Sequence, residues 1–375
     1  MGAASRDGFG DALARPAGRV ATGDARLERA FLFACALDVA VAKPGNVSLD
    51  SAGHGMEARM FIDSARASLP GLLRPGAAVG ERAEAAVIAT RAAVGCNTNL
   101  GILLLGAPIA LAAERLAARA AGAGVAAEAG APPASASDAG AADGGAADEH
   151  PADGGTPADA ARARLRFRFD RLCAELDAVL ATLTVADARH AYRAIAHASP
   201  GGLGDAPEQS VHAEPTIDLR AAMRLAADRD LVAAQYADGF PQVRQGAARF
   251  LRDALGTVPQ AASDGRPEAA MLDVFMTLLA AHPDSHIARK RGTVAAQTVT
   301  DTAAALWFPR PGSPEADRAT LLAGWDAELK SKGINPGTTA DLSVASAFMA
   351  ACVMPKLVSR AGAGVSRLLG TESDS

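Results

Sequence analysis

Hydrophobic residues recur at intervals of three and four along most of this chain, which is the pattern of helices that bury one face. The clearest case runs from Arg26 to Val41, where the apolar positions are Leu27, Ala30, Phe31, Ala34, Leu37 and Val41. The same periodicity predicts further helices over residues 80–93, 99–118, 165–183, 218–237, 268–281, 293–307, 314–331 and 338–353. No alternating pattern of useful length predicts a strand, so the expected fold class is all-α.

One segment interrupts this pattern. Residues 120–161 consist mostly of Ala, Gly, Asp and Pro and contain no Leu, Ile, Phe, Met, Lys or Arg. Such a segment cannot bury enough apolar surface to offset the entropy cost of ordering. We therefore expect a disordered insertion at 120–161 within a single multi-helix domain over residues 26–355. Residues 1–25 are expected to form a flexible N-terminal tail and residues 356–375 a C-terminal tail.

Composition narrows the class of protein further. Alanine is abundant and aromatic residues make up 4% of the chain, which favours helix over sheet. A formal net charge of −5 provides no general basic surface for nucleic acid, so no such partner is expected. The four cysteines are far apart and match no zinc-ligand spacing, which favours a reducing cytoplasm. The longest apolar run, Gly101–Ala113, has 13 residues, short of the roughly 18 that suggest a membrane span.

Four short polar segments separate the alanine-rich helices, and the first is Lys43-Pro44-Gly45-Asn46. Proline fixes the backbone here, glycine lets it approach a ligand closely, and Lys43 carries a positive charge suited to phosphate. The structural alternative is a helix end with an exposed lysine. Lys43, Gly45 and Asn46 are candidate ligand-binding residues.

The second segment, Gly95–Gly101, opens directly onto a predicted apolar helix. A helix N-terminus presents free N–H groups and the positive end of the helix dipole, both suited to an anion. The structural alternative is ordinary capping of that helix. The segment does not match the GxxxxGK[ST] phosphate loop. The candidate binding residues are Asn97, Thr98, Asn99 and Gly101.

The third segment, His282–Gly292, combines an acid, imidazoles and three cations. Asp284 can bind a metal or a hydroxyl group, Arg289 and Lys290 can bind phosphates, and His286 is a further binding candidate. The structural alternative makes Asp284 a helix N-cap. That alternative is weakened because cations near a helix N-terminus oppose the dipole.

The fourth segment, Gly333–Leu342, leads into the last predicted helix. Gly337 and Thr338 are candidate binding residues, and Asp341 is a candidate catalytic carboxylate that would face a cleft lined by the other segments. The structural alternative is a capping box, because Thr338 and Asp341 have its spacing, with Asp in place of Glu or Gln.

Taken together, these segments resemble the motifs of the triphosphoribosyl-dephospho-CoA synthase family. The family's KPG, NT-x-x-G, D(T/S)-x-x-x-R and SPGGSADL-type motifs correspond, in this order, to Lys43–Gly45, Asn97–Gly101, Asp284–Arg289 and Asn335–Leu342. Phe61–Ala65 also matches a D-F-x-x-S-A region loosely. The resemblance covers roughly residues 28–352, apart from the insertion.

The resemblance implies an all-helical transferase that moves the triphosphoribosyl group of ATP to the ribose 2′-hydroxyl of 3′-dephospho-CoA and releases adenine. Asn99 and Leu100 stand where many members have His and Lys, so the chain looks more like the branch of methanogens and methylotrophs, which also shares the region 202–240. One alternative is therefore a related ATP- or phosphoribosyl-dependent transferase that acts on a one-carbon coenzyme precursor. A second alternative is a non-catalytic helical nucleotide-binding protein.

The chemistry of that reaction ranks the candidates. Breaking an N-glycosidic bond builds positive charge on the ribose, so a nearby carboxylate stabilises the transition state and can deprotonate the incoming hydroxyl. Asp284 and Asp341 are the candidates for this role and for Mg²⁺, which prefers carboxylates with phosphate oxygens. Lys43, Arg289 and Lys290 would balance the triphosphate, and Asn97 and Thr98 would orient the ribose or a phosphate. Carboxylates of second rank are Glu81, Asp205 and Glu214.

Overall fold

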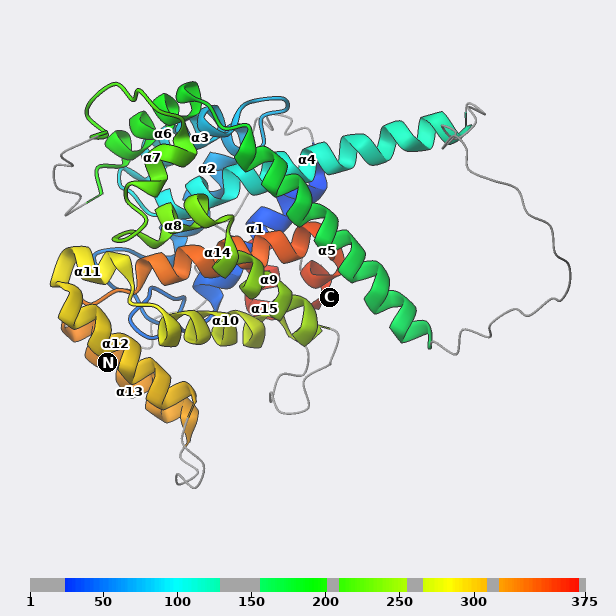
Figure 1. Ribbon diagram of the computed structural model, residues 1–375. Coiled ribbons are helices and arrows are strands. Elements are labelled where there is room, and N and C mark those ends of the chain that lie inside the picture. Colours follow the sequence, from blue (N-terminus) through cyan, green and yellow to red (C-terminus); the bar gives the residue numbers. More distant parts are fainter. Residues whose placement is uncertain (1–23, 129–155, 201–208, 255–265, 309–316, 371–375) are drawn as a thin grey trace, which may run out of the picture.

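The computed structural model describes residues 24–128, 156–200, 209–254, 266–308 and 317–370, and these ranges contain helices but no β-strand (Figure 1). The all-α prediction is confirmed. The helices are α1 Ala25–Ala40, α2 Ala58–Leu72, α3 Val79–Val94, α4 Leu100–Glu128, α5 Pro157–Ala181, α6 Val185–Ala198, α7 Leu219–Arg224, α8 Leu231–Asp238, α9 Pro241–Ala254, α10 Pro267–Ala281, α11 Ser285–Arg291, α12 Thr293–Trp307, α13 Arg318–Ser331, α14 Gly337–Val353, the 3₁₀ helix η3 Pro355–Arg360 and α15 Ala363–Leu369.

Helix α14 lies at the centre of the molecule and contacts α1, α4, α9 and α10 (Figure 1). Its side chains are mostly small or apolar on every face, as expected for a helix that is surrounded by others. The ring of Phe348 on α14 meets that of Phe31 on α1 edge to face, with 5.4 Å between the ring centres. Burial of each such side chain stabilises the fold by about 1.5–3 kcal/mol. Asp341, in the N-terminal half of α14, is therefore held in place by this core.

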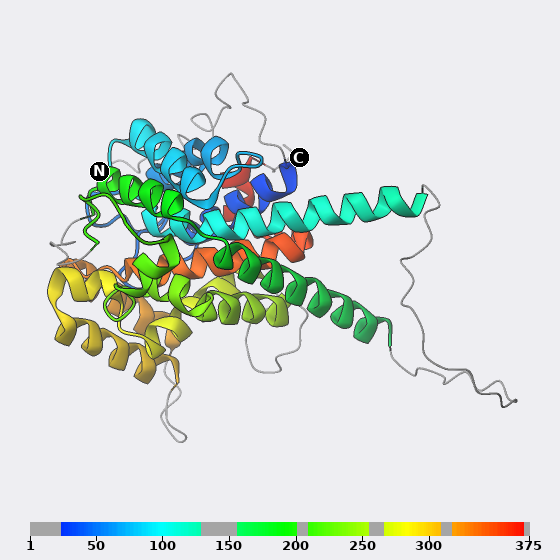
Figure 2. The same cartoon turned by 45° about the horizontal axis from the view of Figure 1, so that its top comes forward.

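Helix α4 starts inside this core, and its far end projects away from the body together with the first part of α5 (Figure 2). Its stretch Leu100–Ala121 is long and apolar enough to cross a membrane by length and composition, but 72% of the most apolar window is buried inside the protein. A core helix of a globular protein has the same character. The start of α4 is the end that matters for the site, because it points into the body.

A second, smaller hydrophobic core joins α10, α11, α12 and α13. It includes Phe275, Ile287, Val299, Trp325 and Leu329. This core places α11 and the loop before α14 beside the start of α4, although these segments are far apart in sequence. The third and fourth polar segments owe their positions to it.

Three predicted boundaries differ from the structure. The predicted helix 218–237 is two helices, α7 and α8, because the Asp230 side chain accepts the N–H groups of Val232 and Ala233 and starts a new helix. The expected insertion 120–161 is helical at both ends: α4 runs to Glu128, since alanine favours helix without burial, and α5 begins at Pro157 behind a Thr156 cap. Residues 129–155 lie outside the described ranges, as do residues 1–23 of the expected N-terminal tail.

The expected C-terminal tail, 356–375, is helical over most of its length. The helix α15 packs on α1, and its Val365 and Leu368 are buried. The Arg66 side chain also donates to the Leu368 carbonyl at 3.0 Å. Two well-placed apolar side chains and one cap are enough to anchor this short segment. The sequence analysis also missed helices α2, α6 and α9, and it gave α11 only as the structural alternative with Asp284 as N-cap.

Candidate active site

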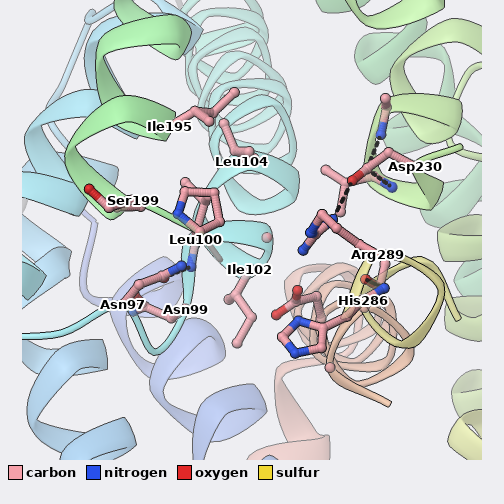
Figure 3. A pocket seen from close by; sticks show the side chains of 18 of the residues that line it. Asn97, Asn99, Leu100, Ile102, Leu104, Ile195, Ser199, Asp230, His286 and Arg289 are labelled. Carbon is pink, nitrogen blue, oxygen red and sulfur yellow. Dashed lines mark hydrogen bonds and ion pairs between the residues drawn. The ribbon is translucent and has the colours of Figure 1, made fainter. Parts of the chain in front are cut away.

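Residues from all four polar segments line one cavity of about 810 Å³. Figure 3 shows part of its wall. Its walls come from the loop after α1, the start of α4, the helices α6 to α8, helix α11 and the start of α14. The predicted residues that line the cavity are Asn46, Asn97, Thr98, Asn99, Gly101, His286, Arg289, Lys290, Gly337, Thr338 and Asp341. Three predicted residues do not line it: Lys43, Gly45 and Asp284. The volume lies within the range of small-molecule sites.

Asp341 is the predicted carboxylate that faces this cavity. A β-carbon built on Gly101 would lie only 2.1 Å from Asp341 Oδ2, so glycine at the start of α4 leaves the space that the carboxylate occupies. Asp341 accepts no hydrogen bond from the described residues. Burial raises the pKa of Asp341 well above its usual value, and the carboxylates of Asp38, Asp284 and Asp230 raise it further, while Arg289 lowers it.

The capping alternative for Asp341 does not match the geometry. The N-cap residue of α14 is Pro336, which makes no side-chain cap, and neither Thr338 nor Asp341 caps this helix. The Thr338 hydroxyl instead accepts hydrogen bonds from the Ser285 hydroxyl at 3.0 Å and from the His286 N–H at 3.2 Å. Thr338 therefore ties α14 to α11 and leaves Asp341 available to a ligand.

Asp284 has the opposite environment. Its side chain is 0% exposed and caps α11, because Oδ1 accepts the Ile287 N–H at 3.0 Å. Oδ2 accepts both the Thr339 N–H at 2.7 Å and the Thr339 hydroxyl at 2.8 Å. Burial raises the pKa of Asp284, and these hydrogen bonds oppose that rise. This geometry favours the structural alternative, since both oxygens already have partners and neither reaches the cavity.

Lys43 is also inside the framework rather than in the cavity. Its ammonium group is 0% exposed and forms an ion pair with Asp38 Oδ1 at 3.0 Å. It also donates to the carbonyl oxygens of Asp38 and Val41. The sequence analysis expected Lys43 either to contact a phosphate or to be an exposed lysine at a helix end. Neither expectation matches this buried ion pair. Asp38, the partner of Lys43, does line the cavity.

The turn at Gly45 joins the first and fourth polar segments. Gly45 has a φ of +78°, and a β-carbon there would lie 2.9 Å from the Ile334 carbonyl oxygen, so only glycine fits. The Asn46 side chain donates to Asn335 Oδ1 at 3.1 Å across the same contact. Gly45 therefore acts by close packing, which places Asn46 at the cavity wall.

Helix α13 fixes this turn from outside the cavity. Asp326 Oδ1 accepts the Gly45 N–H at 2.8 Å, and Asp326 Oδ2 pairs with Lys330 at 2.9 Å. Lys330 in turn donates to the Ser51 hydroxyl at 2.6 Å. His54, in the same loop, has a φ of 57° and donates from Nε2 to the Gly45 carbonyl at 2.9 Å, which turns it toward the cavity. The sequence analysis missed all of these residues, because none belongs to a motif.

Four cationic side chains line the described part of the cavity: Arg91, Arg229, Arg289 and Lys290. Arg91 and Arg229 were not predicted. Arg289 pairs with Asp230 Oδ2 at 3.3 Å, as Figure 3 shows. Asp230 caps α8, and this capping position could have marked Asp230 in the sequence as a candidate partner of Arg289.

His286 faces the same cavity from α11 (Figure 3). Burial, followed by the charges of Lys290 and Arg289, lowers the pKa of His286 to about 4. Its imidazole is therefore neutral near pH 7 and can offer either a lone pair or an N–H group to a ligand.

The start of α4 combines capping with exposure to the cavity. Asn97 Oδ1 accepts the Leu100 N–H at 3.1 Å, so the structural alternative holds for this side chain. The Thr98 hydroxyl donates to the Ser64 hydroxyl at 2.6 Å. The Asn99 amide nitrogen, in contrast, is buried and has no hydrogen-bond partner.

The carboxylates of second rank lie elsewhere. Glu81 accepts the Ala78 N–H at 3.0 Å and completes the cap of α3. Glu214 pairs with Arg189 at 2.7 Å on the surface, and Asp205 lies outside the described residues. No cluster of three or more His, Cys, Asp or Glu side chains that could hold a metal occurs in the described ranges. A metal bound by the protein alone is therefore not indicated by these residues.

Comparison with known proteins identifies the family of this chain. The family model described as ATP:dephospho-CoA triphosphoribosyl transferase matches residues 24–150 and 155–357. The chain belongs to this family. It is a transferase of the triphosphoribosyl-dephospho-CoA synthase type, which confirms the predicted family and enzyme class. The matched ranges contain every predicted residue that lines the cavity.

One solved structure is also similar. It is a crystal structure from Archaeoglobus fulgidus, provisionally described as a triphosphoribosyl-dephospho-CoA synthase, with 20% sequence identity and a TM-score of 0.48. The similarity covers 76% of this chain and 96% of that chain. No curated protein matched the sequence.

Proposed function

We propose that the cavity is the place where ATP transfers its triphosphoribosyl group to the 2′-hydroxyl of dephospho-CoA, and that Asp341 is the carboxylate at the reacting carbon. The observation that carries this assignment is the Asp341 side chain, which faces the cavity and accepts no hydrogen bond from the described residues. Burial and the neighbouring carboxylates raise the pKa of Asp341 well above its usual value, so this side chain holds a proton more tightly than a free aspartate does. A carboxylate in this position would also stabilise positive charge that develops on the ribose.

The transfer has a simple atom balance. The bond between C1′ of the ATP ribose and N9 of adenine breaks, and its electron pair stays on adenine. The 2′-oxygen of the acceptor forms the new bond to C1′. The hydroxyl proton leaves through Asp341, and adenine takes up one proton, so no net proton is produced.

The cations support one direction of ATP in the cavity. Arg289 and Lys290 lie on α11 next to the start of α14, so a triphosphate there would place the ribose near Asp341. We propose that Mg²⁺ arrives with the triphosphate, because Mg²⁺ usually combines one or two carboxylates with phosphate oxygens. Asp341 and Asp38 are carboxylates on the cavity wall that fit this requirement. The free state of all four cysteines fits a cytoplasmic location, which we propose as well.

Adenine release tests the proposal. The purified protein is incubated with ATP and Mg²⁺, with and without dephospho-CoA, and free adenine is measured. We expect adenine in amounts equal to the acceptor consumed, and only when dephospho-CoA is present. Adenine release with a one-carbon coenzyme precursor, but not with dephospho-CoA, would instead support the alternative that Asn99 and Leu100 suggest. No release with any acceptor would contradict catalysis.

A further inference from the structure

One side of the cavity has an apolar surface, in contrast to the α11 side, which carries Arg289 and Lys290. The apolar side is formed by Leu104 of α4, Ile195 of α6, Met223 of α7 and Val232 of α8. Figure 3 shows Leu104 and Ile195 together at one end of the view, away from His286 and Arg289. We call these four residues the apolar chamber. Such a surface suits a flat ring with apolar faces better than it suits a phosphate or a sugar.

Two polar side chains on the cavity wall lack hydrogen-bond partners among the described residues. Asn99 is 4% exposed, and its amide nitrogen makes no hydrogen bond. The phenol of Tyr192 is 6% exposed and makes no hydrogen bond to the described residues. A buried amide nitrogen without a partner costs about 1–3 kcal/mol, so its presence at a cavity wall indicates a group that a ligand completes.

We propose that the apolar chamber binds an adenine ring, with the Asn99 amide on the edge that carries N6 and N7 and the Tyr192 hydroxyl as a second edge partner. An asparagine amide matches this edge, since it can accept from the 6-amino group and donate to N7 at the same time. Both substrates of the proposed reaction contain adenine, so the chamber holds either the leaving base of ATP or the base of dephospho-CoA. The inference therefore rests on the proposed function for its substrates.

Binding of the free bases tests the adenine chamber without turnover. The dissociation constants of adenine and hypoxanthine are measured by calorimetry for the wild type and for Asn99→Leu, Tyr192→Phe and Ile195→Trp. The wild type should bind adenine at least roughly tenfold more tightly than hypoxanthine, whose 6-oxo group cannot donate to the amide oxygen. We expect Asn99→Leu to abolish this preference, Tyr192→Phe to weaken adenine binding roughly fivefold, and Ile195→Trp to prevent it by filling the chamber.

Ile88→Trp is the matched control, because Ile88 is exposed on α3 outside the cavity. It should bind adenine as the wild type does. Failure of the wild type to bind adenine would overturn the inference, and so would an unchanged preference in Asn99→Leu. If Ile195→Trp does not fold, Tyr192→Phe decides, since it removes one oxygen atom that makes no hydrogen bond to the described residues.

Steady-state kinetics identify the source of the ring. A rise of KM for ATP alone in Tyr192→Phe assigns the apolar chamber to the leaving base, and a rise for dephospho-CoA alone assigns it to the acceptor; either result supports the inference.

Asp341→Asn separates this inference from the proposed function, because it should bind adenine normally while losing turnover. A wild type that binds adenine but never releases it from ATP would contradict the proposed function and leave the apolar chamber supported.

Discussion

Asp284 and Asp341 belong to neighbouring polar segments and carry the same chemical group, yet the structure gives them opposite environments. Asp284 accepts three hydrogen bonds through its two oxygens and is sealed between α11 and α14. Asp341 faces the cavity, close to other carboxylates, and accepts no hydrogen bond from the described residues. The first arrangement stabilises the fold, whereas the second keeps a carboxylate available for chemistry.

The same division separates the basic residues. Lys43 is buried in an ion pair with Asp38, so its charge is already balanced within the framework. Arg289 and Lys290 lie on the cavity wall, where a ligand phosphate can reach them. The comparison teaches that the motif residues form two sets: one set holds the segments together and the other set faces the substrate.

Asp341→Asn should give the largest effect on activity. We expect the rate of adenine release to fall about a thousandfold, because a neutral amide neither accepts the hydroxyl proton nor stabilises the cationic ribose. The variant should fold. The difference between its melting temperature and that of the wild type should shift in favour of the variant as the pH increases from about 4. The reason is that the folded state holds the Asp341 proton more tightly than the unfolded chain, so the wild type loses stability as pH rises.

Glu328→Gln is the control for Asp341→Asn. Glu328 lies on α13 outside the cavity, where it pairs with Lys332. It should keep wild-type turnover. Activity of Asp341→Asn within threefold of the wild type would show that the available carboxylate is not the catalytic one, and the division between the two aspartates would fail.

Lys43→Met should instead lower stability, by about 3–5 kcal/mol, because it leaves Asp38 buried without its ion-pair partner. The free energy of unfolding is measured with a chemical denaturant. The double variant Lys43→Met/Asp38→Asn should recover at least half of the loss, since the uncompensated charge is gone. Equal losses in the single and double variants would contradict the buried ion pair as the cause.

Asp284→Asn should cost about 2 kcal/mol of stability, because an amide can replace only one of the two accepting oxygens and leaves an N–H group without an acceptor. Thr339→Val removes only the hydroxyl contact, so its cost should be smaller, about 1 kcal/mol. Both values come from denaturant unfolding. A loss of turnover as large as that of Asp341→Asn, without a loss of stability, would restore Asp284 as a catalytic candidate.

Most of the fold could be predicted from the sequence, since apolar periodicity reports which helices bury a face. The pattern overlooked the start of α8, where the Asp230 side chain competes with the backbone and ends the periodic run. It also overlooked α6, although Thr184 and Asp187 form a capping box that could have revealed it. Capping interactions could have revealed α6 and α8, whereas α2 and α9 carry an amphipathic pattern that the sequence analysis overlooked.

The site was predictable only at the level of segments. Motifs indicated which four segments meet, but the direction of each side chain depends on tertiary contacts that sequence spacing does not contain. Lys43 turns inward because Asp38, one and a half turns earlier, is buried beside it. His54 faces the cavity because Asp326, far along the chain, fixes the Gly45 turn. Tertiary contacts of this kind decide which charged residue becomes structural.

His286→Gln should give the smallest effect, and it appears as a change in the pH dependence of stability. The pKa of His286 is lowered from 6.5 to about 4, so the unfolded chain takes up a proton below pH 6.5 that the folded protein does not. The wild type therefore loses stability as pH falls from about 6.5 to about 4, and His286→Gln should lose less over this interval. His212→Gln, at an exposed position, should follow the wild type. If the melting temperatures of wild type and His286→Gln change in parallel between these pH values, burial and the neighbouring cations do not lower the pKa of His286, and the prediction is wrong.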